Sequence, residues 1–311
     1  MPRKLYKRKL AIMLTAALAL IGTSCSAQFF SGSDTPKSGL VDKVQSAEID
    51  WGSEFYYATG EGTMPSADEE PDSGKAYTKA RGYGKMKAIA NLLMAIEGTT
   101  VSYKAVAKDY IAKDEPLRQA LESYVSNAEI VGEKPRSQGS GSVLLVSIRV
   151  PMYDSKGVCS AVLKSRFQRD PSPDGPASGV NVEKRGDEKA GTISDDAKGP
   201  FTSLIVDCGG LRMDRAISPK LRHTDGSEFW GTALKFDFLQ SHGVVAYAHT
   251  LDEAKAKSRA GSNPLIVRAA GRAGTRAMCD PVLSDVDIDR ALLENRTSQF
   301  LDRFDVIFVV D

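Results

Sequence analysis

The sequence predicts an α+β protein with two small domains of mixed, mostly antiparallel sheet and packed helices, joined by a disordered linker. In both halves of the chain, short β-branched and aromatic runs occur among segments with helical spacing, which is typical of α+β proteins. Between the halves, Arg169 to Gly199 is rich in Pro, Gly, Ser and Asp. This stretch has almost no large apolar residue, so burial cannot offset the entropy lost on ordering it.

These patterns divide the 311 residues into five parts. The expected parts are a leader (1–27), a tether (28–46), a first α+β domain (47–167), the linker (168–199) and a second α+β domain (200–311). The tether is assigned because it contains Ser, Gly, Asp, Pro and Lys with few residues that form cores. At about 100 to 200 residues per domain, the remaining length suits two domains.

The leader has the pattern of a secretory signal peptide. Five basic residues lie among the first nine, and no acidic residue precedes Asp34. An uncharged run from Leu10 to Gly22 follows. That run has the length of a signal-peptide core, about 7 to 15 residues, and is shorter than the roughly 18 apolar residues needed to span a bilayer. We therefore expect export.

Two endings of the leader are open. Gly22-Thr23-Ser24-Cys25 resembles a bacterial lipobox, in which the cysteine becomes an acylated N-terminus, although Gly22 stands where the pattern has Leu or a relative. Small residues up to Ala27 would instead allow ordinary cleavage before Gln28. We favour lipidation of Cys25, because it is flanked by serines at the end of the apolar run. Acyl chains would hold the protein on a membrane without a spanning helix.

The net charge argues against a nucleic-acid partner. The chain has 41 basic and 40 acidic residues. Without the five leader bases, 36 basic residues face 40 acidic ones, so the exported part is mildly acidic. Nucleic-acid binding generally requires a basic footprint.

The first domain is expected to open with an aromatic strand, Ile49–Thr59, which Gly60-Glu61-Gly62 ends. An acidic loop follows at 68–72. A helical stripe then recurs at every fourth residue and ends at Gly98. The stripe consists of Ala76, Ala80, Gly84, Ala88, Leu92 and Ile96. Its small first half predicts close packing on a sheet.

The rest of both domains follows from local patterns. In the first we expect a strand at Thr100–Ala107, a helix at Pro116–Ser126, and antiparallel strands at Ala128–Lys134 and Ser142–Tyr153. In the second we expect strands at Thr202–Asp207, Pro264–Gly271 and Asp305–Val310, helices at Leu251–Arg259 and Val286–Phe304, and a hairpin at 219–230. Asp225-Gly226 is a strong hairpin signal.

Three cysteines follow the leader, at positions 159, 208 and 279. Their spacing matches neither a CxxC motif nor a zinc finger, so buried free thiols are the simplest interpretation. In an oxidising compartment one pair could bridge, and Cys208 with Cys279 is the possible disulfide that we would test.

No cofactor or metal site is predicted. Asp285, Asp287 and Asp289 begin like a calcium loop, but its sixth and twelfth positions are arginines. Ser284 with Asp287 fits a helix cap better. The isolated GxG pairs at 60–62 and 82–84 lack the third glycine of a dinucleotide site, and are read as turn and close-packing glycines.

A catalytic site is not predicted either. The three histidines, His223, His242 and His249, form no HExxH motif. Cys208, His249 and Asp207 could in principle act as nucleophile, base and orienting acid. A cysteine directly after a strand that is expected to be buried is more often part of the core, so we expect no enzyme.

The order of elements carries a family resemblance over residues of about 45–165. It consists of the aromatic strand, Gly60-Glu61-Gly62, the small-residue helix, Ile96-Glu97-Gly98 and the strand Val146–Pro151. This order resembles the twenty-kilodalton bacterial surface lipoprotein family and the N-terminal domain of the flagellar assembly protein T family. Ser203–Asp207 and Asn263-Pro264-Leu265 are similar to tails of uncharacterised envelope proteins. The resemblance implies non-catalytic envelope or basal-body components.

We therefore expect an exported, non-catalytic cell-envelope protein, located in the periplasm or at the periplasmic face of the outer membrane. It would be a lipid-anchored scaffold or assembly component that binds other envelope proteins or flagellar basal-body proteins. The membrane would be contacted through the acyl anchor, with no nucleic acid or known small molecule as partner. Two alternatives remain open: a periplasmic hydrolase, and a glycan- or small-ligand-binding module that uses the aromatic strand Trp51–Tyr57.

Overall fold

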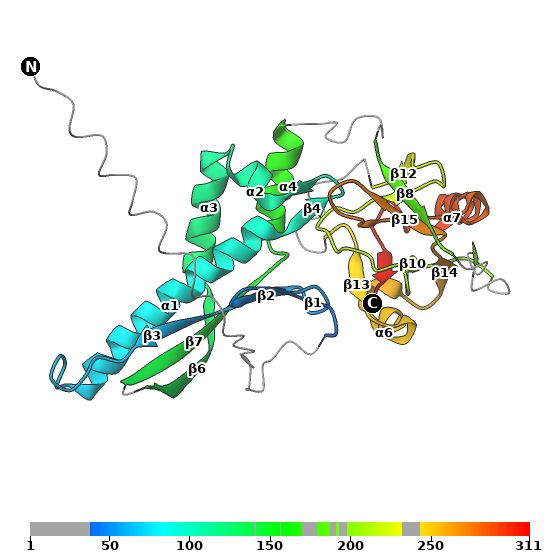
Figure 1. Ribbon diagram of the computed structural model, residues 1–311. Helices are drawn as coiled ribbons and strands as arrows, with labels where there is room; N and C mark the ends of the chain where they lie inside the picture. The colour runs from blue at the N-terminus through cyan, green and yellow to red at the C-terminus, as the bar shows by residue number, and fades with distance from the viewer. Residues whose placement is uncertain are drawn as a thin grey trace, which may run out of the picture.

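The computed structural model describes residues 38–139, 141–155, 157–169, 179–186, 191–192, 198–231 and 243–311. The leader with Cys25, His242 and most of the predicted linker lie outside these residues. The described part contains mixed sheets and helices in both halves, which confirms the α+β class (Figure 1). Within it, no helix has the length and apolar character needed to cross a membrane.

The first half is built on a five-stranded antiparallel sheet in the order β1-β2-β3-β7-β6. The strands are β1 (Val41–Val44), β2 (Ala47–Asp50), β3 (Phe55–Thr63), β6 (Glu129–Gln138) and β7 (Gly141–Pro151). The single strand expected at 49–59 is thus two strands, because the chain turns at Glu54, whose φ is 62°. The end of the expected tether forms β1.

Helix α1 (Ser73–Gly98) lies across this sheet (Figure 1). The Asp72 side chain caps it by accepting the N–H groups of Gly74 and Lys75 at 2.9 and 3.1 Å. All six residues of the predicted stripe are buried, as expected.

Gly60 and Gly62 do not end the strand, as the sequence suggested, but lie inside β3 under α1. A Cβ atom on Gly62 would lie 1.7 Å from the carbonyl oxygen of Ala80, and one on Gly60 would lie 2.2 Å from that of Gly84. These glycines therefore allow the helix backbone to touch the strand backbone, which is their close-packing role.

Short elements surround one end of α1 (Figure 1). They are the hairpin β4 (Thr100–Ser102) and β5 (Ala105–Val106), and helices α2 (Ala107–Ile111), α3 (Glu115–Ser126) and α4 (Val158–Arg169). The expected strand at 100–107 is thus a hairpin that runs into a helix. The α3 prediction is confirmed, and α4 has no counterpart in the sequence analysis.

The second half contains a sheet in the order β13-β17-β10-β14-β9. Its strands are β13 (Ala246–Ala248), β17 (Val306–Val309), β10 (Ser203–Asp207), β14 (Pro264–Arg268) and β9 (Gly191–Thr192). The first four are mutually parallel, and only β9 is antiparallel to its neighbour β14. The antiparallel preference expected for both halves therefore does not apply to this sheet. Parallel neighbours need crossover connections, and α6 (Leu251–Ala256) and α7 (Asp285–Ser298) lie in them.

Another sheet has the order β12-β11-β16-β15-β8. It consists of β12 (Glu228–Trp230), β11 (Leu221–Arg222), β16 (Asp280–Val282), β15 (Gly271–Gly274) and β8 (Asn181–Lys184). The hairpin at Asp225-Gly226 is confirmed, with Gly226 at a φ of 88°. Strands β8 and β9 lie in the segment expected to be a linker. Edge strands can pair through their backbones, so they need few large apolar side chains.

Helix α7 is shorter than the sequence predicted. It ends at Ser298 because Gln299 adopts a left-handed conformation with a φ of 55°. Within the helix, Leu293 is 61% exposed. Phe300 and Leu301 are buried, but they lie beyond the helix.

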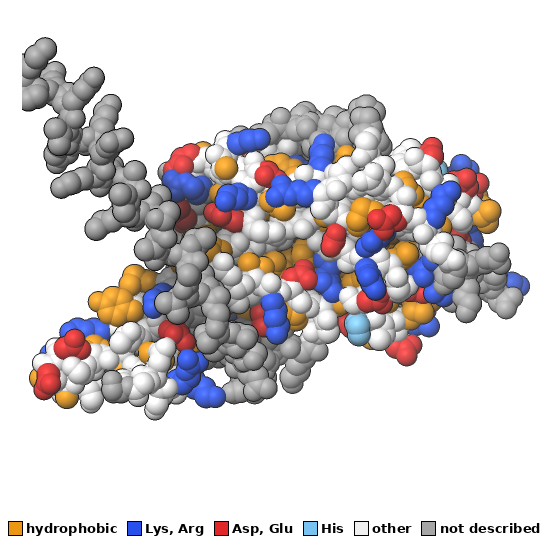
Figure 2. Space-filling model, viewed as in Figure 1, with side chains coloured by type: hydrophobic (Ala, Val, Ile, Leu, Met, Phe, Trp, Pro, Cys, Tyr) orange, Lys and Arg blue, Asp and Glu red, His pale blue; other side chains and the backbone are white. Residues whose placement is uncertain are grey.

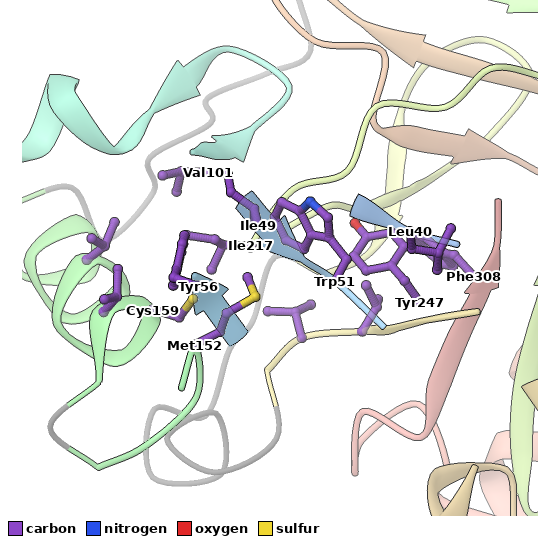
Figure 3. Close-up of a cluster of buried hydrophobic side chains, with 14 of the residues drawn as sticks. Leu40, Ile49, Trp51, Tyr56, Val101, Met152, Cys159, Ile217, Tyr247 and Phe308 are labelled. Atoms are coloured by element: carbon purple, nitrogen blue, oxygen red, sulfur yellow. The ribbon is translucent and has the colours of Figure 1, made fainter. Parts of the chain in front are cut away.

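The two halves share one hydrophobic core (Figure 3). Trp51 from the first half meets Tyr247 from the second edge-on, with ring centroids 5.4 Å apart. The backbones also join, since the N–H groups of Ile217 and Ser218 donate to the carbonyls of Thr100 and Val101 at 3.0 and 2.8 Å. In the described residues, the halves therefore pack as one body.

The tip of the β4–β5 hairpin anchors the first half in the second. The carbonyl of Tyr103 accepts the N–H groups of Arg276 and Ala277 at 2.9 and 3.1 Å. The Arg222 guanidinium lies 4.5 Å from the centroid of the Tyr103 ring and donates to Asp280 at 2.7 Å. Both members of that ion pair are fully buried.

Candidate functional site: a basic pocket beside the parallel sheet

A pocket of about 530 Å³ opens beyond the carboxyl ends of β10 and β14. One wall is the loop that follows β10, and the other comes from β8 and β15 of the neighbouring sheet. It is lined by Glu183, Lys184, Arg185, Gly186, Gly209, Gly210, Leu211, Arg212, Arg268 and Arg272. Ligands of open parallel sheets usually bind beyond the carboxyl ends of the strands, and the volume is in the range of ligand sites, about 300 to 1,000 Å³.

The lining is strongly basic. Among the described residues, it contains five Lys and Arg residues and one carboxylate, that of Glu183. On the face shown in Figure 2, basic and acidic side chains are intermingled over the half of the molecule that carries β10, β13 and β15. The pocket is therefore a local concentration of positive charge on a protein that is acidic outside its leader.

The loop after β10 is held by carboxylates. Gly210 has a φ of 81°, a conformation that favours glycine. The Gly209 N–H donates to Asp207 at 2.9 Å, and the Gly210 N–H donates to Asp311 at 2.7 Å. Because both amides are already engaged, a bound anion would be met by side chains rather than by the loop backbone.

Arg185 ties the walls of the pocket together. This half-buried residue follows β8, and its Nε donates to the carbonyl of Ala269 at 2.9 Å. Its Nη1 donates to the carbonyl of Gly209 at 2.8 Å. The guanidinium therefore fixes the segments after β10 and β14 relative to β8.

The other basic residues fall into two groups. Arg272 donates to Glu183 at 2.7 and 2.9 Å, and Arg268 lies 4.0 Å from Asp207. The exposed side chains of Lys184 and Arg212 have no hydrogen-bonding partner among the described residues. These two are free to turn toward a ligand without breaking a native contact.

The three cysteines are buried free thiols, and the Cys208–Cys279 bridge is not formed. The Cys208 Sγ lies 3.7 Å from the carbonyl oxygen of Val206, and that of Cys279 lies 3.4 Å from Asp280. Burial raises the pKa of all three thiols, including Cys159. Because the thiolate is the reactive form, none of them is activated as a nucleophile.

The considered Cys208–His249–Asp207 arrangement is not assembled. The His249 ring lies beside Gly39, whose added Cβ would be 3.3 Å from it. Asp207 accepts the Gly209 amide. The other described histidine, His223, lies 3.3 Å from the exposed Asp285.

The acidic run at 285–289 caps a helix, as predicted. Ser284 accepts the Asp287 N–H at 3.2 Å and donates to its carboxylate at 2.6 Å. Across the described ranges, no group of three or more His, Cys, Asp or Glu side chains is placed to hold a metal ion.

The aromatic strand considered for glycan binding is largely inside the protein. Trp51, Tyr56 and Tyr57 are 2%, 0% and 4% exposed. The Trp51 Nε1 donates to Asp42 at 2.6 Å, and Arg215 of the second half donates to the same carboxylate at 2.6 Å. Trp51 joins the two halves, and the burial of all three rings means that they do not offer a ligand-binding platform.

Sequence reasoning missed the basic pocket. Its residues come from four separate stretches between 183 and 272, and one of these lies in the segment expected to be a linker. The usable signal was the pair Gly209-Gly210 just after a buried strand, since such turns commonly adjoin sites in parallel sheets.

One family model matches part of the chain. It is described as Treponema pallidum Tp0624, second domain, and it matches residues 203–311. The matched region runs from β10 to β17, so it includes the pocket wall formed by the β10 loop but not β8. No curated protein matches the chain.

Proposed function

We propose that this protein is an exported, lipid-anchored, non-catalytic component of the cell envelope that binds another envelope component. The observation that carries the proposal is the basic pocket at the carboxyl ends of β10 and β14. It has the size and charge of a recognition site, and the lining residues that the structure describes include no cysteine, histidine or serine.

The anchor and the location rest on the sequence of the leader. The basic residues, the apolar run and Cys25 support export and acylation. Acylation would place the protein at the periplasmic face of a membrane. The partner classes are other envelope proteins, among them the flagellar basal-body components that the family resemblance implies.

The burial and the contacts of the residues that catalysis would require support a non-catalytic role. The cysteines are buried with raised thiol pKa values, so they are poor nucleophiles. Asp207 accepts the Gly209 amide, and the His249 ring lies beside Gly39.

Metabolic labelling with a fatty-acid analogue tests the anchor. Wild-type protein should carry the label and sediment with membranes, and Cys25→Ala should lose both properties. Ser26→Ala is the matched control and should remain labelled. An unlabelled wild-type protein whose mature N-terminus is Gln28 would rule out the anchor.

Cross-linking followed by purification from the membrane fraction tests the binding role. A defined envelope component should co-purify with the wild-type protein in near-constant ratio. Recovery of the protein alone, from cells in which it is abundant and folded, would contradict a binding role.

A further inference from the structure

We propose that the basic pocket binds a phosphate group of its ligand, with Lys184 and Arg212 as the direct contacts. This inference deepens the proposed function, on whose binding role it rests, and it does not depend on the acyl anchor. The argument uses the charge of the lining, the state of each basic side chain and the position of the pocket in the sheet.

Charge selects the ligand class. Among the described residues, five basic side chains line the pocket, and the one lining carboxylate, that of Glu183, is paired with Arg272. Counting two further acids, Asp207 beside Arg268 and Asp311 on the Gly210 amide, still leaves an excess of positive charge. A dianionic phosphate matches this excess better than a carboxylate, and Arg and Lys are the usual phosphate ligands.

Geometry selects the contacts. Lys184 ends β8 on one wall, and Arg212 belongs to the β10 loop on the other. Arg272 holds the carbonyl of Arg212, which fixes the backbone of that residue while leaving its side chain exposed. A phosphate between the walls could be reached from both sides.

The remaining basic residues position this site. Arg185 is hydrogen-bonded to the carbonyls of Ala269 and Gly209, and it therefore keeps the β10 loop in place. The glycine amides of that loop are engaged by Asp207 and Asp311. Phosphate affinity should consequently depend on the lysine and arginine side chains.

Equilibrium binding to the detergent-solubilised full chain at low salt tests the proposal, with glycerol 3-phosphate as the probe in calorimetry. Lys184→Gln and Arg212→Gln should each weaken binding about tenfold, since a hydrogen bond to a charged group is worth about that factor. Glu183→Gln should strengthen binding, because it removes a negative charge and releases Arg272. Arg296→Gln is the control.

The control removes one exposed positive charge far from the pocket. Arg296 lies on α7. In this helix Arg290 stacks on Phe201, near the amino end of β10, whereas the pocket lies beyond the carboxyl end of that strand. An equal loss of affinity in Arg296→Gln and Arg212→Gln would show a general charge effect and overturn the assignment. Failure of the wild-type protein to bind any of the phosphate-bearing probes would overturn it as well.

Three further probes identify the source of the phosphate. Binding of inorganic phosphate and glycerol 3-phosphate supports a soluble phosphorylated ligand, whereas binding of only dihexanoyl phosphatidic acid, whose phosphate is also a monoester, supports a lipid headgroup. Acetate that binds as tightly as phosphate would refute the choice of phosphate. Failure of all probes would leave the labelling and co-purification results unaffected, so it would refute this inference and not the proposed function.

Discussion

Replacing Gly62 by alanine should push α1 away from the sheet of the first half. The new Cβ would lie 1.7 Å from the carbonyl oxygen of Ala80 and 2.8 Å from the nitrogen of Gly84. Both are helix backbone atoms, which cannot move aside as a side chain can. Overpacking costs about 1 to 3 kcal/mol, and the better backbone propensity of alanine returns about 0.5 to 1 kcal/mol. Because backbone atoms this close cannot move aside, the upper end of the overpacking cost applies, and we expect a net loss of about 2 kcal/mol.

Three other glycines calibrate this value. Gly132→Ala in β6 places its Cβ at 3.6 Å from the Ser147 Cβ, an ordinary contact, so stability should change little. Gly84→Ala in α1 meets a Val146 methyl at 2.6 Å and should cost less than Gly62→Ala, because that side chain can adjust. Gly82→Ala in the same helix meets nothing within 4 Å and should stabilise by about 0.5 to 1 kcal/mol.

Urea denaturation of the full chain, followed by far-ultraviolet circular dichroism, measures these differences. The reasoning predicts that Gly82→Ala and Gly62→Ala shift the midpoint in opposite directions. If Gly62→Ala is as stable as Gly132→Ala, then α1 does not contact the strand backbone and the account of the small-residue stripe fails.

Three further changes test the interior. Ala88→Leu should lower the melting temperature, because Ala88 is fully buried under the sheet and overpacking costs about 1 to 3 kcal/mol; an unchanged value would place it on the solvent face. The buried thiols should resist Ellman's reagent in the folded protein, and three thiols should react after the acylated protein is denatured. If only one thiol reacts after denaturation, the other two form a disulfide. Burial raises the pKa of Glu54, so its contribution to stability should be full below pH 4.5 and disappear as pH rises through the raised pKa. Glu54→Gln should abolish this decrease of the free energy of unfolding with rising pH, as measured by urea denaturation across the range. An unchanged decrease would assign it to other titratable groups.

Local patterns predicted much of the fold. The stripe from Ala76 to Ile96 is buried, and the Asp225-Gly226 hairpin forms, because both depend on residues close together in the sequence. The strand at Ser203–Asp207 was predicted from its apolar run. Its parallel neighbours were not, since strand pairing over long sequence separations leaves no local signal.

Function-bearing features were harder to predict for the same reason. Trp51 suggested a ligand platform, yet it packs on Tyr247, about two hundred residues later, and joins the two halves. Lys184 lay in a segment too polar to predict as structured, but backbone pairing of β8 with β15 orders it. The basic pocket exists only after these distant segments meet.

Complementation of a deletion strain tests the central claim most directly, namely that the protein works by binding through the basic pocket and without catalysis. Cys208→Ser and His249→Ala should restore the wild-type phenotype when the variants are folded and present at normal levels. The double variant Lys184→Gln/Arg212→Gln should fail to restore it at the same level. The account would be contradicted if folded Cys208→Ser or His249→Ala failed to restore the wild-type phenotype while the double variant restored it fully.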